Sequence, residues 1–294
     1  MSKKKELKQE QIDKELLEQF SGGLLFSPED KRDYSLEDAE VPMCAAAFPE
    51  EYRTEGKMPI LNQGVTSECV AHAIATAMGY GEYKAGFKNV HNFSRGMIYG
   101  NREATHYQGE GMYTREALRQ VNHYGDCMYD TFPHIGSYPN MKAIFEEGKE
   151  KYLAEAEPYK IVNYFRCYNE DDVKRAIMEQ GAVVIAINIY DGFGKNVKLP
   201  EPGAKSKGGH AMCCVGWTKE GWLVQNSWGS TSGDKGYVHI PFEYPVKEWW
   251  GITVNKNVPL PPHKTWIQKF GQAMGNFFRK VGMWIKNLFR KKSK

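Results

Sequence analysis

The stretches Gly208-Gly209-His210-Ala211 and Gln225-Asn226-Ser227-Trp228-Gly229 indicate the fold of this chain of 294 residues. A third stretch, Asn62-Gln63-Gly64, stands upstream and is followed by Cys69. Each feature alone is weak, because a glycine pair usually marks a turn and a single cysteine is usually a small core residue. Their joint occurrence in this order is the informative observation.

Four residues, in this order along the chain, have the types that a cysteine-dependent acyl-transfer site requires. Gln63 lies six residues before Cys69, and His210 lies 141 residues after Cys69. Asn226 follows His210 by 16 residues. Acyl transfer of this kind requires a thiol nucleophile, an imidazole base, a group that orients the base and a donor for the oxyanion. We therefore predict that Cys69, His210, Asn226 and Gln63 are catalytic.

The position of Cys69 predicts an activated thiol. Only a thiolate attacks a carbonyl, and an ordinary cysteine has a pKa of about 8.5. Residues 69–83 are mostly small or apolar and predict a helix that begins at the nucleophile. The positive end of its dipole would favour the thiolate. His210 is expected to pair with that thiolate as an imidazolium and to protonate the leaving amine.

Three other side chains are expected to support this pair. Asn226 would hold the second imidazole nitrogen of His210, and Trp228 would shield that hydrogen bond from water. Gln63 would donate a side-chain N–H to the oxyanion, beside the backbone N–H of Cys69. Loss of one such donor typically costs about 2.7–4 kcal/mol of transition-state stabilisation.

No metal or cofactor is predicted from the sequence. Cys213 and Cys214 are adjacent in an apolar run that reads as a strand, so their side chains should face opposite ways and form no joint metal site with His210. His72 is expected on another face of the helix of Cys69, and the other histidines, His134 among them, have no companion in sequence. The chain also lacks the common metal, phosphate-binding and serine-hydrolase motifs.

These motifs resemble the papain-like cysteine peptidases. Asn226-Ser227-Trp228-Gly229 and Gly233-Asp234-Lys235-Gly236-Tyr237 are similar to the family's last motif, and residues 28–34 and 109–118 are similar to segments of a bacterial and viral subgroup without a long pro-segment. The resemblance covers residues 24–255. It implies a two-lobed α+β fold, with a helical lobe, an antiparallel β-sheet lobe, the active site in the cleft between them and a polypeptide substrate.

The resemblance also implies substrate-binding residues and shows two departures. Gly111 would lie on the strand that binds the substrate backbone, and Gly209 and Trp228 would line the same cleft. The stretch Thr66-Ser67-Glu68-Cys69-Val70 lacks the upstream cysteine and the tryptophan that are common in the family, which removes a disulfide and argues against a secreted form. Ser232 stands where many members have a second tryptophan, which puts the shape of the primed-side cleft in doubt.

The order of predicted elements supports an α+β fold independently. Helices are expected at residues 69–83, 114–123 and 171–180, and strands at residues 182–190, 208–217, 221–225 and 236–240. Helices in the first part and antiparallel strands in the second are typical of that class.

Composition limits where the protein acts. Six cysteines without a dense framework fit a reducing compartment. Residues 1–19 are hydrophilic and show no signal peptide, and no apolar stretch is long enough to span a membrane. We therefore expect a cytoplasmic protein. The net charge of +3 is uneven, because ten of the 39 basic residues and none of the 36 acidic ones follow Glu248, so a nucleic-acid partner is not expected.

Four parts are predicted along the chain. Residues 1–23 form an amphipathic N-terminal helix and extension, residues 24–256 the peptidase domain, residues 257–263 a Pro-rich linker and residues 264–294 a basic amphipathic helix. The last helix is expected to bind an anionic membrane surface, which would make the protein peripheral to the membrane, or a partner protein. The first helix is expected to be structural, with a regulatory role as the alternative.

Two functional alternatives stay open beside peptide-bond hydrolysis. The same acyl-enzyme could serve a transpeptidase or an isopeptidase, because the thioester chemistry is shared. The chain could also be a membrane-interacting scaffold with a vestigial peptidase fold, although such a scaffold has no chemical need for all four catalytic residues.

Overall fold

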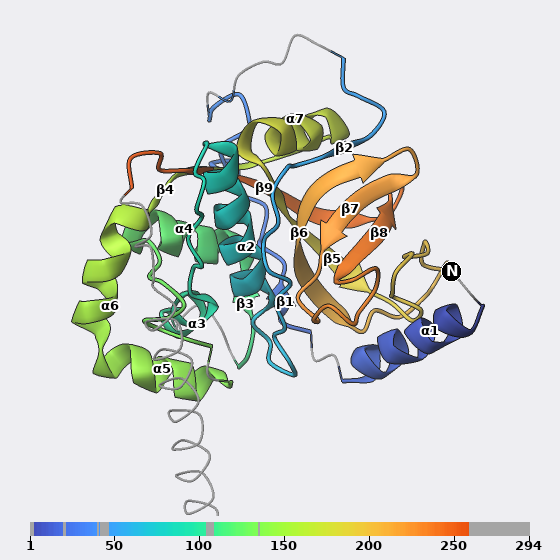
Figure 1. Cartoon of the computed structure of the whole chain (residues 1–294), viewed down its shortest axis with the longest axis horizontal. Helices are drawn as coiled ribbons and strands as arrows, with labels where there is room; N and C mark the ends of the chain where they lie inside the picture. Colours follow the sequence, from blue (N-terminus) through green and yellow to red (C-terminus); the bar gives the residue numbers. More distant parts are fainter. Residues whose placement is uncertain are drawn as a thin grey trace, which may run out of the picture.

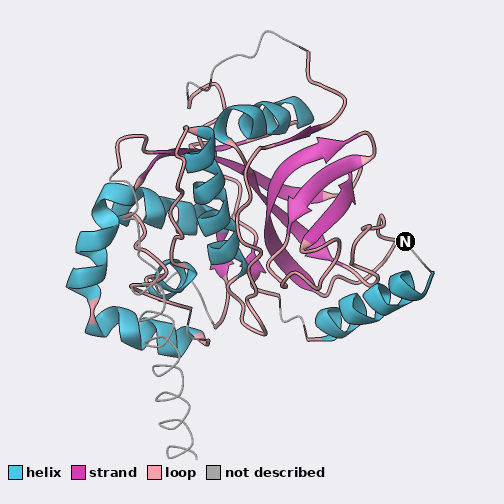
Figure 2. Cartoon of the chain, viewed as in Figure 1, coloured by secondary structure: helices cyan, strands magenta, loops and turns pink. Residues whose placement is uncertain are grey.

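A computed structural model describes residues 3–19, 22–39, 41, 47–103, 109–134 and 136–258. In this part of the chain, most helices gather to the left of the longer strands of a curled sheet, one helix lies above the strands and the N-terminal helix lies at their lower right (Figures 1 and 2). The prediction of an α+β fold is confirmed. The C-terminal helix expected at residues 264–294, and most of the linker before it, lie outside the described residues.

The helical lobe contains α2 (Cys69–Lys84), α3 (Arg95–Gly100), α4 (Thr114–Tyr124), α5 (Tyr138–Glu147), α6 (Lys149–Ala156) and the 3-10 turn η2 (Glu157–Tyr159). Helix α2 is buried along almost its whole length. Its many alanines and glycines allow close approach on every side, which suits a helix in the centre of a domain rather than at its surface. The nucleophile position is therefore carried by a central, rigid element.

The sheet is antiparallel apart from one short pair. Its main path runs β3 (Met112–Tyr113), β1 (Leu24–Leu25), β6 (Gly208–Thr218), β5 (Val183–Ile189), β9 (Val246–Val254) and β4 (Ile161–Arg166). Strand β6 also pairs with β2 (Tyr52–Arg53) and β7 (Gly221–Gln225), and β7 pairs with β8 (Tyr237–Pro241). Among the strand pairs of the described residues, β1 with β3 is the parallel one.

The two faces of the sheet contact different cores. Along β5, Val184 and Ala186 pack in the core that contains α2, whereas Val183, Ile185 and Ile187 pack in the core that contains α7 (Glu170–Gln180). Side chains alternate in this way because the repeat of a strand is two residues. Cys213 and Cys214 divide in the same way, which confirms that they cannot form one site.

Helix α1 (Lys3–Glu18) packs beside the lower end of the strands (Figure 1). Leu17 is buried there, and the carboxylate of Asp13 accepts the backbone N–H of Gly233 at 2.9 Å. From this helix the chain passes between the lobes as residues 22–25. Within the described part of the chain, no helix has the length and apolar character needed to cross a membrane.

Candidate active site

Cys69 is the first residue of α2, and its side chain has no exposed surface. Backbone N–H groups of Ala211, Val70 and Gly23 point at the thiol. These donors lower the pKa of the thiol, but burial has the larger effect and raises the pKa of Cys69 to about 12. Burial outweighs the donors because no water remains to solvate a thiolate.

His210 lies on β6 and is also fully buried. Its Nε2 lies 2.8 Å from Oδ1 of Asn226, and the same oxygen accepts the backbone N–H of Ser227 at 2.8 Å. The Ser227 N–H can only donate, so it identifies Oδ1 as the acceptor and fixes the amide orientation. It follows that Nε2 carries the imidazole proton and that Nδ1 is the nitrogen able to take a proton from a thiol.

Two aromatic rings enclose the imidazole. The ring of Trp228 lies 5.1 Å from the ring of His210 at an interplanar angle of 33°, and Phe193 meets both rings edge-on. Burial among these rings lowers the pKa of His210 to about 4, against the opposite effect of the Asn226 hydrogen bond. Trp228 therefore shields the pair, as predicted. Phe193 was missed because it is a single aromatic residue in a glycine-flanked loop, with no periodicity to mark it.

Gln63 is fixed in a loop that is bound to the loop of Asn226. Its backbone N–H donates to the carbonyl of Ser227 at 2.9 Å, and its side-chain oxygen accepts the Ser227 hydroxyl at 2.6 Å. Its Nε2 donates to the carbonyl of Thr66 at 2.7 Å. One hydrogen of Nε2 remains to donate to an oxyanion. Two hydrogen bonds hold the side chain and a third holds its backbone, so its donor is preorganised.

Residues 22–25 cover the nucleophile from the side of the helical lobe. The backbone N–H of Met112 donates to the carbonyl of Gly23 at 3.0 Å, and Leu24 pairs with both Met112 and Gly209. A methyl group added at Gly23 would lie 2.3 Å from the carbonyl oxygen of Ser67. This covering segment therefore sits directly against the backbone that precedes Cys69.

The residues expected to bind substrate lie beside this covering segment. A Cβ at Gly209 would lie 2.5 Å from the carbonyl oxygen of Leu24, and one at Gly111 would lie 2.8 Å from that of Gly23. The backbone of Gly111 is already engaged, because its N–H donates to the Tyr99 hydroxyl and its carbonyl accepts from Arg102. The neighbouring N–H, that of Met112, is the one that donates to the covering segment, at the carbonyl of Gly23.

The expected thiolate–imidazolium pair is not the state that this structure favours. Burial raises the pKa of the Cys69 thiol and lowers the pKa of the His210 imidazole, so both groups are neutral near pH 7. The helix N-terminus is in place, as expected, and backbone donors that were not predicted also surround the thiol. The covering segment removes solvent from the thiol, and the rings of Trp228 and Phe193 enclose the imidazole.

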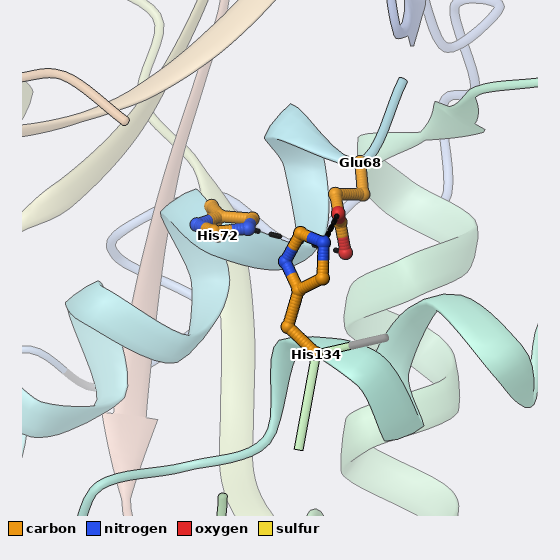
Figure 3. Close-up of side chains that lie close together, drawn as sticks. All are labelled: Glu68, His72 and His134. Atoms are coloured by element: carbon orange, nitrogen blue, oxygen red, sulfur yellow. Dashed lines mark ion pairs between the residues drawn. The ribbon is translucent and has the colours of Figure 1, made fainter. Parts of the chain in front are cut away.

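A second cluster of polar side chains lies next to the nucleophile. Glu68, His72 and His134 come together from α2 and from the loop before α5 (Figure 3). His72 and His134 had no visible companion in sequence, because 61 residues, which include α3 and α4, lie between them. This cluster is the one place among the described residues where three metal-ligating side chains meet.

Comparisons with known proteins agree with this geometry. A family model described as papain family cysteine protease matches residues 50–253. An uncharacterized peptidase C1-like protein of Acanthamoeba polyphaga mimivirus is 28% identical over 204 residues, which cover 64% of this chain and 66% of that protein. Papain of Carica papaya is 27% identical over 197 residues, which cover 65% of this chain and 53% of papain. The matches thus span less than two thirds of these two relatives.

A solved structure confirms the predicted two-lobed fold. Xylellain, a cysteine protease from Xylella fastidiosa, superposes with a TM-score of 0.68 at 23% sequence identity. The superposition covers 79% of this chain and 95% of xylellain.

Proposed function

Because the chain belongs to the papain family of cysteine proteases, we propose that it hydrolyses peptide bonds of a polypeptide substrate through a thioester on Cys69. The observation that supports this proposal is that the start of α2 and strand β6, which are distant in sequence, meet at Cys69 and His210. Cys69 at the start of α2 lies against the backbone of Ala211, the residue after His210, and His210 is oriented by Asn226 at 2.8 Å.

Each catalytic step has a residue in place for it. Nδ1 of His210 takes the thiol proton, and the Cys69 sulfur attacks the substrate carbonyl carbon. The negative charge that develops on the carbonyl oxygen is stabilised by Nε2 of Gln63 and the backbone N–H of Cys69. His210 then protonates the leaving amine, and water activated by the same imidazole releases the acid. Asn226 and Trp228 hold the ring throughout.

The closed site further suggests an enzyme that needs opening. The covering segment, residues 22–25, pairs with β3 and β6, so an extended substrate must displace it to reach the sulfur. Leu16 and Gln19 border a cavity of about 140 Å³ that Gln63 and Trp228 also line. The N-terminal region therefore lies next to site residues both there and at residues 22–25, which favours the regulatory alternative for residues 1–23.

Replacing Gln63 by alanine tests the assignment of the oxyanion donor. We expect kcat for a peptide substrate to fall by about 10²–10³-fold, the usual effect of removing one such donor, with little change in KM. The matched control is Gln120→Ala, because Gln120 also donates to a backbone carbonyl, that of Ile98, but lies on α4. If Gln63→Ala and Gln120→Ala changed kcat and KM by similar amounts, the role of Gln63 would be contradicted.

Products distinguish hydrolysis from acyl transfer in the same assay. Hydrolysis yields a free carboxylate, and mass spectrometry in the presence of an added primary amine reports how the acyl-enzyme divides between water and amine. A dominant amide product at millimolar amine would favour the transpeptidase alternative over the peptidase. A substrate with an isopeptide bond tests the remaining alternative.

For residues 264–294 we propose attachment to an anionic membrane surface of the cytoplasm, with a partner protein as the alternative. The support is the sequence pattern alone: apolar residues at steps of three and four, with lysine and arginine at other positions. Full-length protein should sediment with vesicles that contain phosphatidylserine, whereas a 1–262 truncation should not. Equal sedimentation of both would contradict membrane binding, and loss of sedimentation with retained proteolysis would exclude a mere scaffold.

A further inference from the structure

The cluster next to the nucleophile has the composition of a metal site. Nε2 of His134 lies 3.0 Å from Oε1 of Glu68, and Nε2 of His72 lies 3.9 Å from Oε2 of the same carboxylate. One ligand atom from each residue lies within 4.8 Å of the other two. Figure 3 shows the rings of His72 and His134 next to the carboxylate of Glu68, each joined to it by a dashed line.

Several polar atoms of the cluster are buried without a hydrogen bond. Glu68 and His72 are 0% and 1% exposed. Among the described residues, Oε2 of Glu68 and both ring nitrogens of His72 have no hydrogen-bond partner. Leaving a buried polar group unsatisfied costs about 1–3 kcal/mol. Native proteins rarely leave three such atoms together, and a bound ion is one of the standard explanations.

The protonation states in the cluster favour a cation as ligand. Burial lowers the pKa of His72 well below its usual value, so its imidazole is neutral, which is the form that binds metal. Burial raises the pKa of Glu68 to about 8. Around these residues, Arg95 adds a positive charge and Glu110 a negative one. A cation would return Glu68 to its anionic form and balance it.

We propose that Glu68, His72 and His134 bind one divalent transition-metal ion, with Zn²⁺ as the ion that fits best. Two imidazoles, one carboxylate and an open fourth position form a common tetrahedral zinc set. Zinc–ligand distances of about 2.0–2.1 Å place neighbouring ligand atoms about 3.3 Å apart. The cluster needs to contract by no more than about 1.5 Å to reach this spacing.

The loop position of His134 makes that contraction and the entry of the ion feasible. Its side chain is 18% exposed, whereas those of the other two residues are closed to solvent. The site would also act on the catalytic centre, because Glu68 caps the helix whose first residue is Cys69. An ion bound there places positive charge beside the thiol and holds the N-terminus of α2.

Calorimetry on chelator-treated protein tests the site with Zn²⁺ alone. The full chain carrying Cys69→Ala is the parent, so that the catalytic thiol cannot hold the ion. We expect one equivalent of Zn²⁺ to bind and to raise the Tm of the parent. Glu68→Gln and His134→Asn should each weaken binding by at least about 10-fold, while His123→Asn, which alters an exposed histidine of α4, should leave it unchanged.

Cobalt gives a second readout that does not depend on activity. Co²⁺ bound to the parent should show the visible absorption of a four- or five-coordinate site without thiolate bands, and His134→Asn should lose it. His134 is partly exposed, so this variant should fold even if Glu68→Gln does not. Binding that is equal in the parent and in a folded His134→Asn variant, or no stoichiometric binding to the parent, would overturn the proposal.

Discussion

Replacing Cys69 by alanine is expected to lower kcat for peptide hydrolysis by at least about 10⁴-fold, the scale seen when a covalent nucleophile is removed. The alanine side chain cannot form the thioester, and the remaining donors of Gln63 and of the backbone then have no tetrahedral intermediate to stabilise. The fold should survive, because the lost sulfur is one buried atom at the first turn of α2. Turnover of a fluorogenic peptide measures the effect.

Cys167→Ala is the matched control for this variant. Cys167 is also free and buried, and burial raises the pKa of its thiol as well. Unlike Cys69, it lies away from His210, shortly before α7. It should retain turnover. An epoxide that alkylates cysteine peptidases should add once to the wild type, not at all to Cys69→Ala, and much more slowly to His210→Ala. Retention of more than about 1% of the wild-type kcat in Cys69→Ala would refute the thioester mechanism.

Replacing Gly23 by alanine is expected to speed alkylation of Cys69 at neutral pH by at least about tenfold. The added methyl group would lie 2.3 Å from the Ser67 carbonyl oxygen, so the covering segment has to move away from the backbone of Ser67. Exposure to water then removes the burial that raises the pKa of the Cys69 thiol to about 12. As the thiol pKa falls toward its ordinary value of about 8.5, the thiolate fraction at pH 7 rises.

The pH profile separates uncovering from general destabilisation. The alkylation rate of Gly23→Ala should begin to rise at lower pH than that of the wild type, because its thiolate forms at lower pH. Gly203→Ala is the control for backbone strain without a clash, since Gly203 has a φ of +80° and a Cβ there meets no atom within 4 Å. If Gly23→Ala and the wild type react at the same rate and with the same pH profile, residues 22–25 do not limit access to the nucleophile.

The main elements and the four proposed catalytic residues could be predicted because their signals are local. A small-residue run marks α2, and an apolar run flanked by turn residues marks β6. The predicted strands at residues 221–225 and 236–240 differ from β7 and β8 by at most one residue. The order and separation of Cys69, His210 and Asn226 resemble those of the papain-like peptidases, so these residues were expected to lie together. In the structure the Cys69 thiol lies against the backbone of Ala211, and His210 lies 2.8 Å from Asn226.

Other features of the site depend on contacts that no local pattern contains. Phe193 reaches His210 from a loop, and His134 reaches Glu68 from another loop. The direction of the pKa shifts also could not be predicted. A helix N-terminus and a nearby imidazole argue for a thiolate, but the solvation of the thiol depends on where residues 22–25 pass.

The sequence by itself therefore determined which chemistry this protein can carry, since residue type, order and spacing specify a nucleophile, a base and their supports. Tertiary structure alone decided the protonation states of the Cys69 thiol and the His210 imidazole, and which side chains surround them. Desolvation depends on every atom that surrounds a group, and those atoms come from segments as distant as Gly23, Trp228 and His134. Burial is a property of the folded whole, so it appears only when the chain is folded.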